Sequence, residues 1–509
     1  MTQATAKSGR DGVLNAADDH RRQDVQQAVS SACDQLRADG VDARDYVEQL
    51  AWLFFLKAFD EMESRREEEA SFDGTPYRRR LDGDYRWASW SSMANRPAQM
   101  LEFVDGRLWP HLRAFGQTED TQQFASEAVA ERFRRIFSTV RNHSRRGVSF
   151  ARVVQQVNRL HFGEATDVIV LSEIYEGLLK DVAADSAGYA GEFYTQRHII
   201  RCMVDVVRPK IGERVYDPCF GTAGFLAEAA EHVRNAAGTL SGRDLDRLQH
   251  RTFWGIENKA LTYLLGTMNM LLHGIEGASL ELGNTLELHS NNVTERDRYD
   301  VILCNPPYGG KMARELQSNF TVRSGSTEIL FLQHIMANLA KGGRAAVIVP
   351  EGVLFRGGPD AKVRRRLLRE FDVHTILSLP SGCFLPYTGV KTNVLFLKRH
   401  EDERGTESVW YYELTNDGFD LKSTRRPIEG SQIPDFLTKW KARAGGENSW
   451  EVTITQIADQ DWDLSAKNPG EEVGIDHMPA LELVQSMKAK EERVLELLKE
   501  LEDLLEPSG

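Results

Sequence analysis

The tetrapeptide Asn305-Pro306-Pro307-Tyr308 contains the residue types needed to bind an amino group on a planar ring. The side-chain oxygen of Asn305 and the carbonyl of Pro306 can accept both N–H bonds of such an amine, which favours a pyramidal nitrogen with an available lone pair. Tyr308 offers a ring face on which a base can stack. Asparagine and proline are also common in turns, so the tetrapeptide alone also fits a simple turn.

A second motif, over residues 217–225, lies upstream and strengthens the catalytic interpretation. It follows a short predicted strand, 214–216, and precedes a predicted helix that begins near Phe225. Glycines between a strand and a helix expose backbone N–H groups and let a ligand approach the main chain. The motif lacks both the ending of a phosphate loop and the glycine spacing of a dinucleotide site. The acid at the strand end, Asp217, suits a cationic amino group better than a pyrophosphate.

Glu257 ends the next predicted strand, which covers residues 252–256. A carboxylate at the end of the second strand can accept hydrogen bonds from the two hydroxyls of a ribose. Together with Asp217, it indicates a nucleoside with an amino-acid tail and no phosphate, a description that fits S-adenosylmethionine. Taken alone, Glu257 also fits a solvated acid at a strand end.

The rest of the chain supplies an α/β framework for these motifs. Residues 165–400 alternate predicted strands and helices, which is typical of a mostly parallel sheet with an antiparallel last hairpin. Further strands are predicted over 299–304, 344–349, 375–379 and 393–398, and helices over 328–340 and 361–370. Open sheets of this kind bind ligands at the carboxyl ends of their strands, where the polar motifs lie.

Helical regions are predicted on both sides of the sheet. Residues 1–22 are polar and predict disorder, and residues 23–160 predict a helical domain. Its clearest apolar stripe consists of Val47, Leu50, Ala51, Phe54 and Phe55. Residues 401–509 form an extension whose final helix, about 478–506, carries an apolar heptad seam. This helix either folds back on its own domain or packs against helices of a partner.

Composition restricts the functions open to the chain. The 509 residues suggest several domains, and the absence of a long apolar run or a secretory signal predicts a cytoplasmic protein without a membrane span. The net charge of −13 is unusual for a protein that binds DNA alone, since phosphate contacts require Lys and Arg. Basic clusters at 141–146 and 364–366 fit solvated helix faces better than a DNA-binding surface.

Five cysteines are scattered through the chain without a C-x-x-C pair, so neither a disulfide framework nor a metal site is predicted. Cys219 and Cys304 border the motifs and could be mistaken for nucleophiles. Because the tetrapeptide binds an amine and needs no thiolate, both are interpreted as small buried residues.

The sequence resembles the amino-group DNA methyltransferases, and more closely the modification subunits of type I restriction-modification systems, which methylate N6 of adenine. The resemblance covers most of the chain from about residue 25 onward. Its central segments are 191–195 (Gly-Glu-Phe-Tyr-Thr), 217–225, 282–286 and 305–308, and its flanking segments are 32–37, 53–57 and 462–469. It implies a class I methyltransferase (Rossmann-like) fold and S-adenosylmethionine as the cofactor.

The resemblance also implies roles for individual residues. The methionine end of the cofactor would be covered by Glu192, Phe193, Tyr194, Thr195, Gln196 and Arg197. The cofactor floor would be formed by Asp217, Gly221, Thr222, Ala223 and Gly224. Glu257 would hold the ribose, Asn284 would lie near the cofactor adenine, and the target base would contact Asn305, Pro306 and Tyr308. Gln196 departs from the family, which commonly has proline after the threonine.

The implied reaction is direct transfer of the sulfonium methyl group to N6 of an adenine flipped out of the duplex. An aromatic residue, Phe384 or Tyr387, could contact this base, although packing in a turn is the preferred interpretation. Protein glutamine and guanine in RNA also present a planar conjugated amine and stay open as substrates. The chain could also serve chiefly to assemble a nuclease complex and to sense methylation.

The resemblance implies partners as well. DNA would be reached through a specificity subunit, and the full complex would contain a second copy of the chain and a restriction or translocase subunit. The acidic balance agrees with a partner that supplies most of the DNA affinity. The short region after the sheet also leaves little room for a separate target-recognition domain.

Overall fold

The computed structural model describes residues 16–117, 127–162, 195–385, 388–422 and 425–465, and the single residues 468, 469, 488 and 491. Several predicted features lie outside these residues. They are residues 1–15 of the polar segment 1–22, Glu192, Phe193, Tyr194, Tyr387 and nearly all of the heptad helix over 478–506. Residues 16–22 belong to a helix that begins at Ala16, so the prediction of disorder was wrong for that part of the segment.

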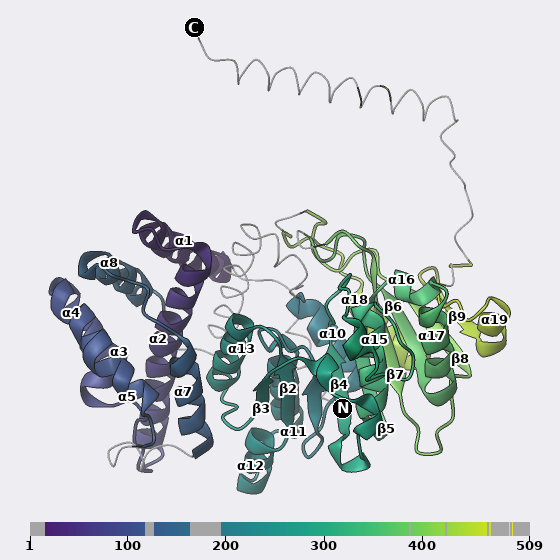
Figure 1. Cartoon of the computed structure of the whole chain (residues 1–509), viewed down its shortest axis with the longest axis horizontal. Helices are drawn as coiled ribbons and strands as arrows, with labels where there is room; N and C mark the ends of the chain where they lie inside the picture. The colour runs from purple at the N-terminus through teal and green to yellow at the C-terminus, as the bar shows by residue number, and fades with distance from the viewer. Residues whose placement is uncertain are drawn as a thin grey trace, which may run out of the picture. The chain divides into compact units, whose positions relative to one another are not determined.

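The amino-terminal residues form helices, as predicted (Figure 1). These helices pack around a core rich in aromatic side chains. The helices are α1 (Ala16–Ala38), α2 (Ala43–Phe72), α3 (Trp87–Ser91), α4 (Pro97–Phe103), α5 (Trp109–Arg113), α7 (Glu127–Thr139) and α8 (Gly147–Asn158). All five members of the predicted apolar stripe on α2 are 0% exposed. The Phe133 ring of α7 packs against Phe55 and Phe59 at centroid distances of 5.6 and 5.0 Å, so α2 and α7 share one core.

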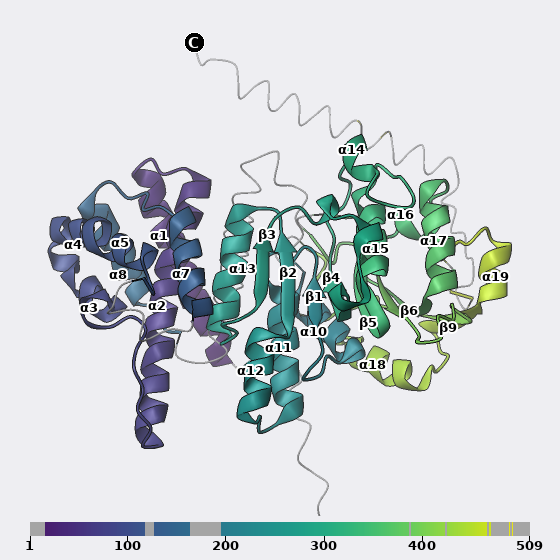
Figure 2. The ribbon, with the colours of Figure 1, turned by 60° about the horizontal axis from the view of Figure 1, so that its bottom comes forward.

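A mixed sheet follows, whose strands among the described residues lie in the order β3-β2-β1-β4-β5-β7-β6-β8-β9. Figure 2 shows its first part, from β3 through β2, β1 and β4 to β5. The strands are β1 (Val215–Asp217), β2 (Phe253–Glu257), β3 (Ser279–Leu282), β4 (Tyr299–Cys304), β5 (Leu339–Pro350), β6 (Asp372–Ser378), β7 (Thr392–Lys398), β8 (Ser408–Glu413) and β9 (Ser449–Thr453). From β3 to β5 the neighbouring strands are parallel, whereas β7 is antiparallel to β5 and β6. The predicted parallel sheet with an antiparallel hairpin is therefore present.

Helices cover both faces of the sheet. They are α10 (Arg197–Val207), α11 (Gly224–Ala237), α12 (Gly242–His250), α13 (Ala260–Leu272), α14 (Arg314–Gln317), α15 (Thr327–Asn338), α16 (Gly352–Phe355), α17 (Pro359–Glu370), α18 (Ile433–Ala442) and α19 (Ile454–Asp459). Val301 and Leu303 of β4 pack in the cluster that contains α10 and α11, whereas Ile302 and Cys304 pack in the one that contains α15 and α17. Burial on both faces explains the uninterrupted apolar sequence of β4.

The sheet extends further than the sequence predicted. Strand β8 pairs in parallel with β6, and β9 pairs antiparallel with β8, so the sheet continues past residue 400. The prediction that Arg364 lies on a solvated helix face was wrong: it is 2% exposed and donates to the carbonyls of Val353, Arg356 and Trp462. Among the described residues, no helix has both the length and the apolar character that crossing a membrane requires.

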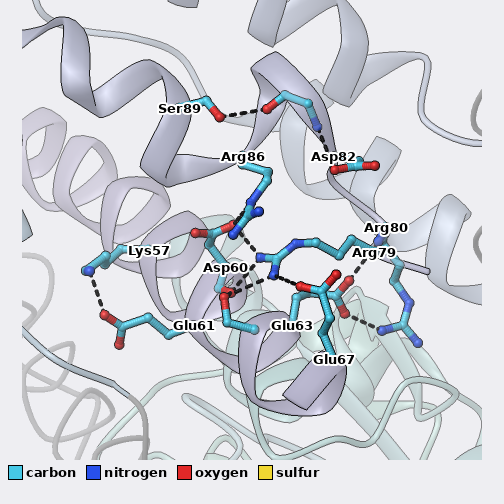
Figure 3. Close-up of polar contacts among 12 residues, drawn as sticks. Lys57, Asp60, Glu61, Glu63, Glu67, Arg79, Arg80, Asp82, Arg86 and Ser89 are labelled. Carbon is cyan, nitrogen blue, oxygen red and sulfur yellow. Dashed lines mark hydrogen bonds and ion pairs between the residues drawn. The ribbon is translucent and has the colours of Figure 1, made fainter. Parts of the chain in front are cut away.

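Buried ion pairs connect α2 to the segment that follows it (Figure 3). Arg79, 3% exposed as a side chain, donates to Asp60 Oδ1 at 2.6 Å and also contacts Glu67 at 3.1 Å. Arg80 contacts Glu63, whose side chain is 1% exposed, at 2.7 Å. A buried charge must be paired to be tolerated, so these carboxylates fix the path of the chain after α2.

We predict that Asp60→Ala destabilises the helical region by about 3–5 kcal/mol, because it leaves the buried Arg79 without its closest partner. The control is Asp84→Ala, which removes the exposed ion pair with Arg107 and should cost about 0–1 kcal/mol. Urea unfolding followed by circular dichroism measures both variants. Equal effects would show that the Asp60 pair contributes no more than a surface pair.

Candidate active site

Asn305 lies at the carboxyl end of β4, where the chain leaves the sheet. Its Nδ2 donates to Thr195 Oγ1 at 3.0 Å, and its Oδ1 accepts a short hydrogen bond from the Tyr308 hydroxyl. Burial raises the pKa of Tyr308 well above its usual value, so the hydroxyl keeps its proton and can act as the donor. Pro306 is buried, whereas Asn305 and Tyr308 are half-buried. The loop thus joins three predicted site residues: Thr195, Asn305 and Tyr308.

The start of α15 holds this loop, a contact that the sequence analysis did not identify. Glu328 Oε1 accepts from the Gly309 N–H at 3.0 Å, and Thr327 Oγ1 donates to the Pro307 carbonyl at 3.1 Å. Gly310 packs so closely that an added Cβ would lie 2.7 Å from the Thr327 methyl carbon. The only sequence signal for this anchor was a polar cluster at the start of an otherwise apolar helix.

Asp217 ends β1, and its side chain is 0% exposed. Its Oδ1 accepts from the Cys219 N–H at 3.0 Å, whereas Oδ2 has no hydrogen-bond partner among the described residues. Burial, reinforced by the charge of Glu257, raises the pKa of Asp217 to about 8. A buried carboxyl oxygen without a partner is unfavourable, so this atom marks a place for a donor or a cation from outside the chain.

Two side-chain contacts connect the 217–224 turn to neighbouring loops at the same sheet edge. Cys219 Sγ donates to the Asn305 carbonyl at 3.6 Å, and Thr285 Oγ1 donates to the Pro218 carbonyl through a short hydrogen bond. Strand β1 pairs in parallel with both β2 and β4, so the carboxyl ends of these strands meet. The 217–224 turn and the 305–308 loop therefore lie side by side.

Glu257 ends β2 and uses both carboxylate oxygens to bind the backbone. Oε2 accepts from the Gly221 N–H and Oε1 from the Lys259 N–H, each at 2.9 Å. Gly221 has φ of +55°, and a Cβ added there would meet nothing within 4 Å, so the main chain is open to a ligand at this point. In the next loop, Asn284 is half-buried and its Oδ1 accepts from the Leu286 N–H at 3.1 Å. Glu257 thus shapes the turn, and its contact with a ribose stays a prediction.

Ala223 completes the turn in an unusual conformation. It is buried and has φ of +62°, in the left-handed region that a residue with a Cβ seldom adopts. The next residue, Gly224, begins α11, and its carbonyl accepts from Arg197 Nη1 at 3.2 Å. Arg197 also lies 3.7 Å from Glu228, so its contacts support the start of α11. Its predicted contact with the cofactor stays a prediction.

Gln196, at the position where the family commonly has proline, immediately precedes α10 and has φ of −57°. This angle lies within the range that a proline ring imposes, so glutamine follows the same backbone path as proline would.

Phe384 is 1% exposed and belongs to a core cluster, which agrees with packing in a turn. Cys304 is buried, as predicted, whereas Cys219 is half-buried. Burial raises the pKa of both thiols above the usual value, so neither is a ready thiolate.

Comparison with known proteins defines the family. The family model for N-6 DNA methylases matches residues 166–477, and the model for the HsdM N-terminal domain matches residues 25–157. The methylase subunit of the type I restriction enzyme EcoEI from Escherichia coli is 34% identical over 496 residues, which cover 94% of this chain and 97% of that protein. The chain belongs to the N-6 DNA methylase family.

Solved structures of similar proteins agree with this membership. A modification subunit from Vibrio vulnificus YJ016 is 32% identical with a TM-score of 0.76, covering 88% of this chain and 97% of that one. A chain from a type I restriction-modification system, solved to study complex assembly, is 36% identical with a TM-score of 0.67, covering 96% and 99%. The predicted class I methyltransferase fold, type I modification-subunit family, adenine-N6 DNA methylation and S-adenosylmethionine cofactor are confirmed.

The residues at the sheet edge fit the cofactor of an N-6 DNA methylase. S-adenosylmethionine carries an amino group and a positively charged sulfonium, and Asp217 presents a buried carboxyl oxygen without a described partner. The main chain at Gly221 faces open space, as close approach of a ligand requires. Both features have the chemistry that the amino-acid end of the cofactor needs.

We predict that Asp217→Asn stabilises the cofactor-free methylase and weakens cofactor binding. Without a cofactor, the folded protein keeps the Asp217 proton up to about pH 8, whereas the unfolded chain loses it near pH 4. The folded state therefore binds more protons between these values, and its stability falls as the pH rises through this window. Asparagine cannot ionise, so the gain in melting temperature should be larger at pH 8.5 than at pH 5.

Differential scanning calorimetry and titration calorimetry with S-adenosylmethionine measure the two effects. Asp246→Asn, at an exposed position of α12, removes the same formal charge and serves as the control. A gain that is equal at both pH values would mean that Asp217 does not titrate in this window.

Proposed function

We propose that this methylase transfers the methyl group at the sheet edge where the 305–308 loop meets the 217–224 turn. Bound S-adenosylmethionine supplies an electrophilic methyl carbon on a sulfonium. The residues of the chain would bind the cofactor, hold the flipped adenine and orient N6 toward that carbon. The 3.6 Å contact between Cys219 and the Asn305 carbonyl is the observation that carries this proposal, since it brings the two loops together.

Asn305 and Pro306 would orient the amine. The Asn305 Oδ1 and the Pro306 carbonyl would each accept one N6–H bond, which makes the lone pair of the nitrogen available for attack. Transfer of the methyl carbon from the sulfonium to N6 would leave the cofactor as a neutral thioether and release one N6 proton to water. Positioning and fixed hydrogen bonds would supply most of the rate gain. Thr195 supports this role because its hydroxyl accepts from Asn305 Nδ2.

The ring of Tyr308 would stack on the base. Its hydroxyl also affects how the amine of the base reaches Asn305. In the structure this hydroxyl donates to Asn305 Oδ1, the atom that the adenine amine would need. Because an amide oxygen has two lone pairs, the amine can donate to Asn305 Oδ1 beside the tyrosine hydroxyl or in its place.

For the cofactor, we propose that Asp217 binds the amino group and that Gly221, Thr222, Ala223 and Gly224 line the turn beneath it. Glu257 would accept from the ribose hydroxyls at the carboxyl end of β2 while it holds the Gly221 N–H. Asn284 would lie near the adenine, in the loop that Thr285 connects to Pro218. Residues 192–194, together with Thr195, Gln196 and Arg197, would cover the methionine end.

The methylase would act as part of a larger complex. We propose a specificity subunit that reads the DNA, a second copy of this chain, and a restriction or translocase subunit. The net charge of −13 supports a partner that supplies most of the DNA affinity. Because the substrate is DNA, we also propose a cytoplasmic location.

We propose the domain division 1–22, 23–160, 165–400 and 401–509. In this division, β8 and β9 of the last region complete the sheet of the methyltransferase domain. The final helix, over 478–506, would pack against helices of the specificity subunit. The basic residues of 141–146 lie between α7 and α8, so the prediction of a helix face was wrong for them, although Arg141, Arg145 and Arg146 are exposed as predicted. Arg146 lies 3.8 Å from Asp39.

We predict that Asn305→Ala abolishes methylation, because the amine loses its side-chain acceptor, while cofactor binding survives. Tritium transfer from S-adenosylmethionine to DNA, in the complex assembled with the specificity subunit, measures the reaction, and titration calorimetry measures the binding. Thr195→Val removes only the partner of Asn305 Nδ2 and should lower the rate less. Retained activity in Asn305→Ala would remove Asn305 from the mechanism.

The ring and the hydroxyl of Tyr308 should have separable effects. Tyr308→Phe keeps the ring and frees Asn305 Oδ1, so methylation should stay close to the normal rate. Tyr308→Ala removes the stacking surface, worth about 1–3 kcal/mol, and should lower kcat/KM by roughly 10- to 100-fold. Fluorescence of 2-aminopurine at the target position reports whether the base still leaves the duplex. Equal losses in both variants would assign the effect to the hydroxyl instead of the ring.

A further inference from the structure

Helix α13 is shared between the helical region and the sheet. All of its residues except the first are buried. Leu261, Leu264, Leu265, Met268 and Leu271 belong to the hydrophobic cluster of the amino-terminal helices. Tyr263 and Met270, on other sides of the same helix, belong to the cluster that packs under the sheet. The helix is therefore packed into both cores.

One side of α13 contacts the turn proposed to bind the cofactor. Asn269, 1% exposed, donates from Nδ2 to the Thr222 carbonyl at 2.8 Å. A Cβ added at Gly266 would lie 2.6 Å from the Phe220 ring and 2.7 Å from the Gly221 carbonyl, so helix and turn are in direct contact. Asn269 thus fixes the peptide that precedes Ala223, whose left-handed conformation shapes the end of the turn.

The segment after α13 is fastened to the amino-terminal helices by charged groups. Glu276 lies 3.0 Å from Arg66 of α2 and 2.6 Å from Arg80, and Arg80 also contacts Glu63 in the buried network of Figure 3. From α7, Arg132 donates to the carbonyls of Ile275 and Ala278. The helical region therefore holds α13 at its carboxyl end as well as along its apolar surface.

We infer that Asn269 is a positioning residue for the cofactor turn and that the helical region sets S-adenosylmethionine affinity through α13. This inference rests on the placement of the cofactor at the 217–224 turn proposed above. The hydrogen bond from Asn269 holds the Thr222 carbonyl in place, and the ion pairs of Glu276 hold the helix that carries Asn269. A shift of the amino-terminal helices would therefore move α13 and, through Asn269, the 217–224 turn. This route does not pass through Asn305 or Tyr308.

Replacing Asn269 by leucine tests the first step, because leucine keeps the volume and removes the donor. Titration calorimetry on the full chain should show a Kd for S-adenosylmethionine raised about fivefold to tenfold, the effect of one lost hydrogen bond. Hydrogen exchange of the 219–224 amides should be faster without the cofactor. In the assembled enzyme, KM for the cofactor should rise while kcat stays within about twofold, because the base-binding loop is untouched.

Asn338→Leu is the matched control. Asn338 is also a buried asparagine in a helix, 7% exposed, but it donates to His334 of α15 and does not contact the turn. It should lower stability and leave the cofactor Kd unchanged. If Asn269→Leu lowers stability as Asn338→Leu does and also leaves the Kd and the 219–224 exchange unchanged, Asn269 is only structural and the inference fails.

Glu276→Gln tests the second step and keeps the inference testable if Asn269→Leu does not fold. It should raise the cofactor Kd by about twofold to fourfold, whereas Asp84→Asn, at the exposed pair with Arg107, should not. A Kd unchanged in Glu276→Gln would overturn the role of the helical region. Asp217→Asn separates this inference from the proposed site: if it too left the Kd unchanged, the cofactor placement itself would be wrong.

Discussion

Parallel pairing of β1 with β2 on one side and with β4 on the other is the constraint on which the site depends. It makes three chain segments leave the sheet at the same edge, although they are far apart in sequence. The turn after β1 then contacts the loop after β4 through Cys219 and Asn305, and the loop after β3 through Pro218 and Thr285. A shift of register in β1 would separate Asp217 from Asn305, the residues proposed to bind the cofactor and the base.

The turn after β1 contains two features that lower the stability of the fold. The Asp217 carboxyl is buried with one oxygen lacking a described partner, and Ala223 adopts a left-handed conformation in which its Cβ is strained. Surrounding contacts hold the turn: Asp217 binds the Cys219 N–H, Glu257 binds the Gly221 N–H, and Asn269 binds the Thr222 carbonyl. Local features that oppose stability and persist only through such support are characteristic of functional sites.

Local sequence patterns predicted the elements that carry the site, but not the contacts between them. The prediction for β4 matched the structure at both ends, because an apolar run followed by two prolines marks a strand end unambiguously. Strand β8 was missed because its place beside β6 depends on long-range pairing that no local pattern encodes. Arg364 was misassigned because a run of arginines looks the same whether it faces water or buried carbonyl groups.

Hydrogen bonds between side chains that are far apart along the chain could not be predicted from the sequence either. Thr195 and Asn305 are 110 positions apart, and their hydrogen bond depends on the complete sheet. Asn269 offered one usable signal, since an asparagine inside a continuous apolar helix must find a partner when it is buried. That partner, the Thr222 carbonyl, lies 47 positions away, so the signal indicates that a contact exists without indicating where.

The acceptors of the 305–308 loop bear on how the proposed site selects a base. Before a base arrives, the Tyr308 hydroxyl already satisfies Asn305 Oδ1, so the half-buried loop presents no unpaired acceptor from that atom. The amide oxygen has two lone pairs, so under the proposed function an exocyclic amine can donate to Asn305 Oδ1 beside the tyrosine hydroxyl or in its place. A thymine in the same position would turn a carbonyl oxygen toward Asn305 Oδ1 and the Pro306 carbonyl, and acceptors that face one another without a donor in a partly dry site are unfavourable. The two acceptors of the loop would therefore act against a base that lacks an exocyclic amine.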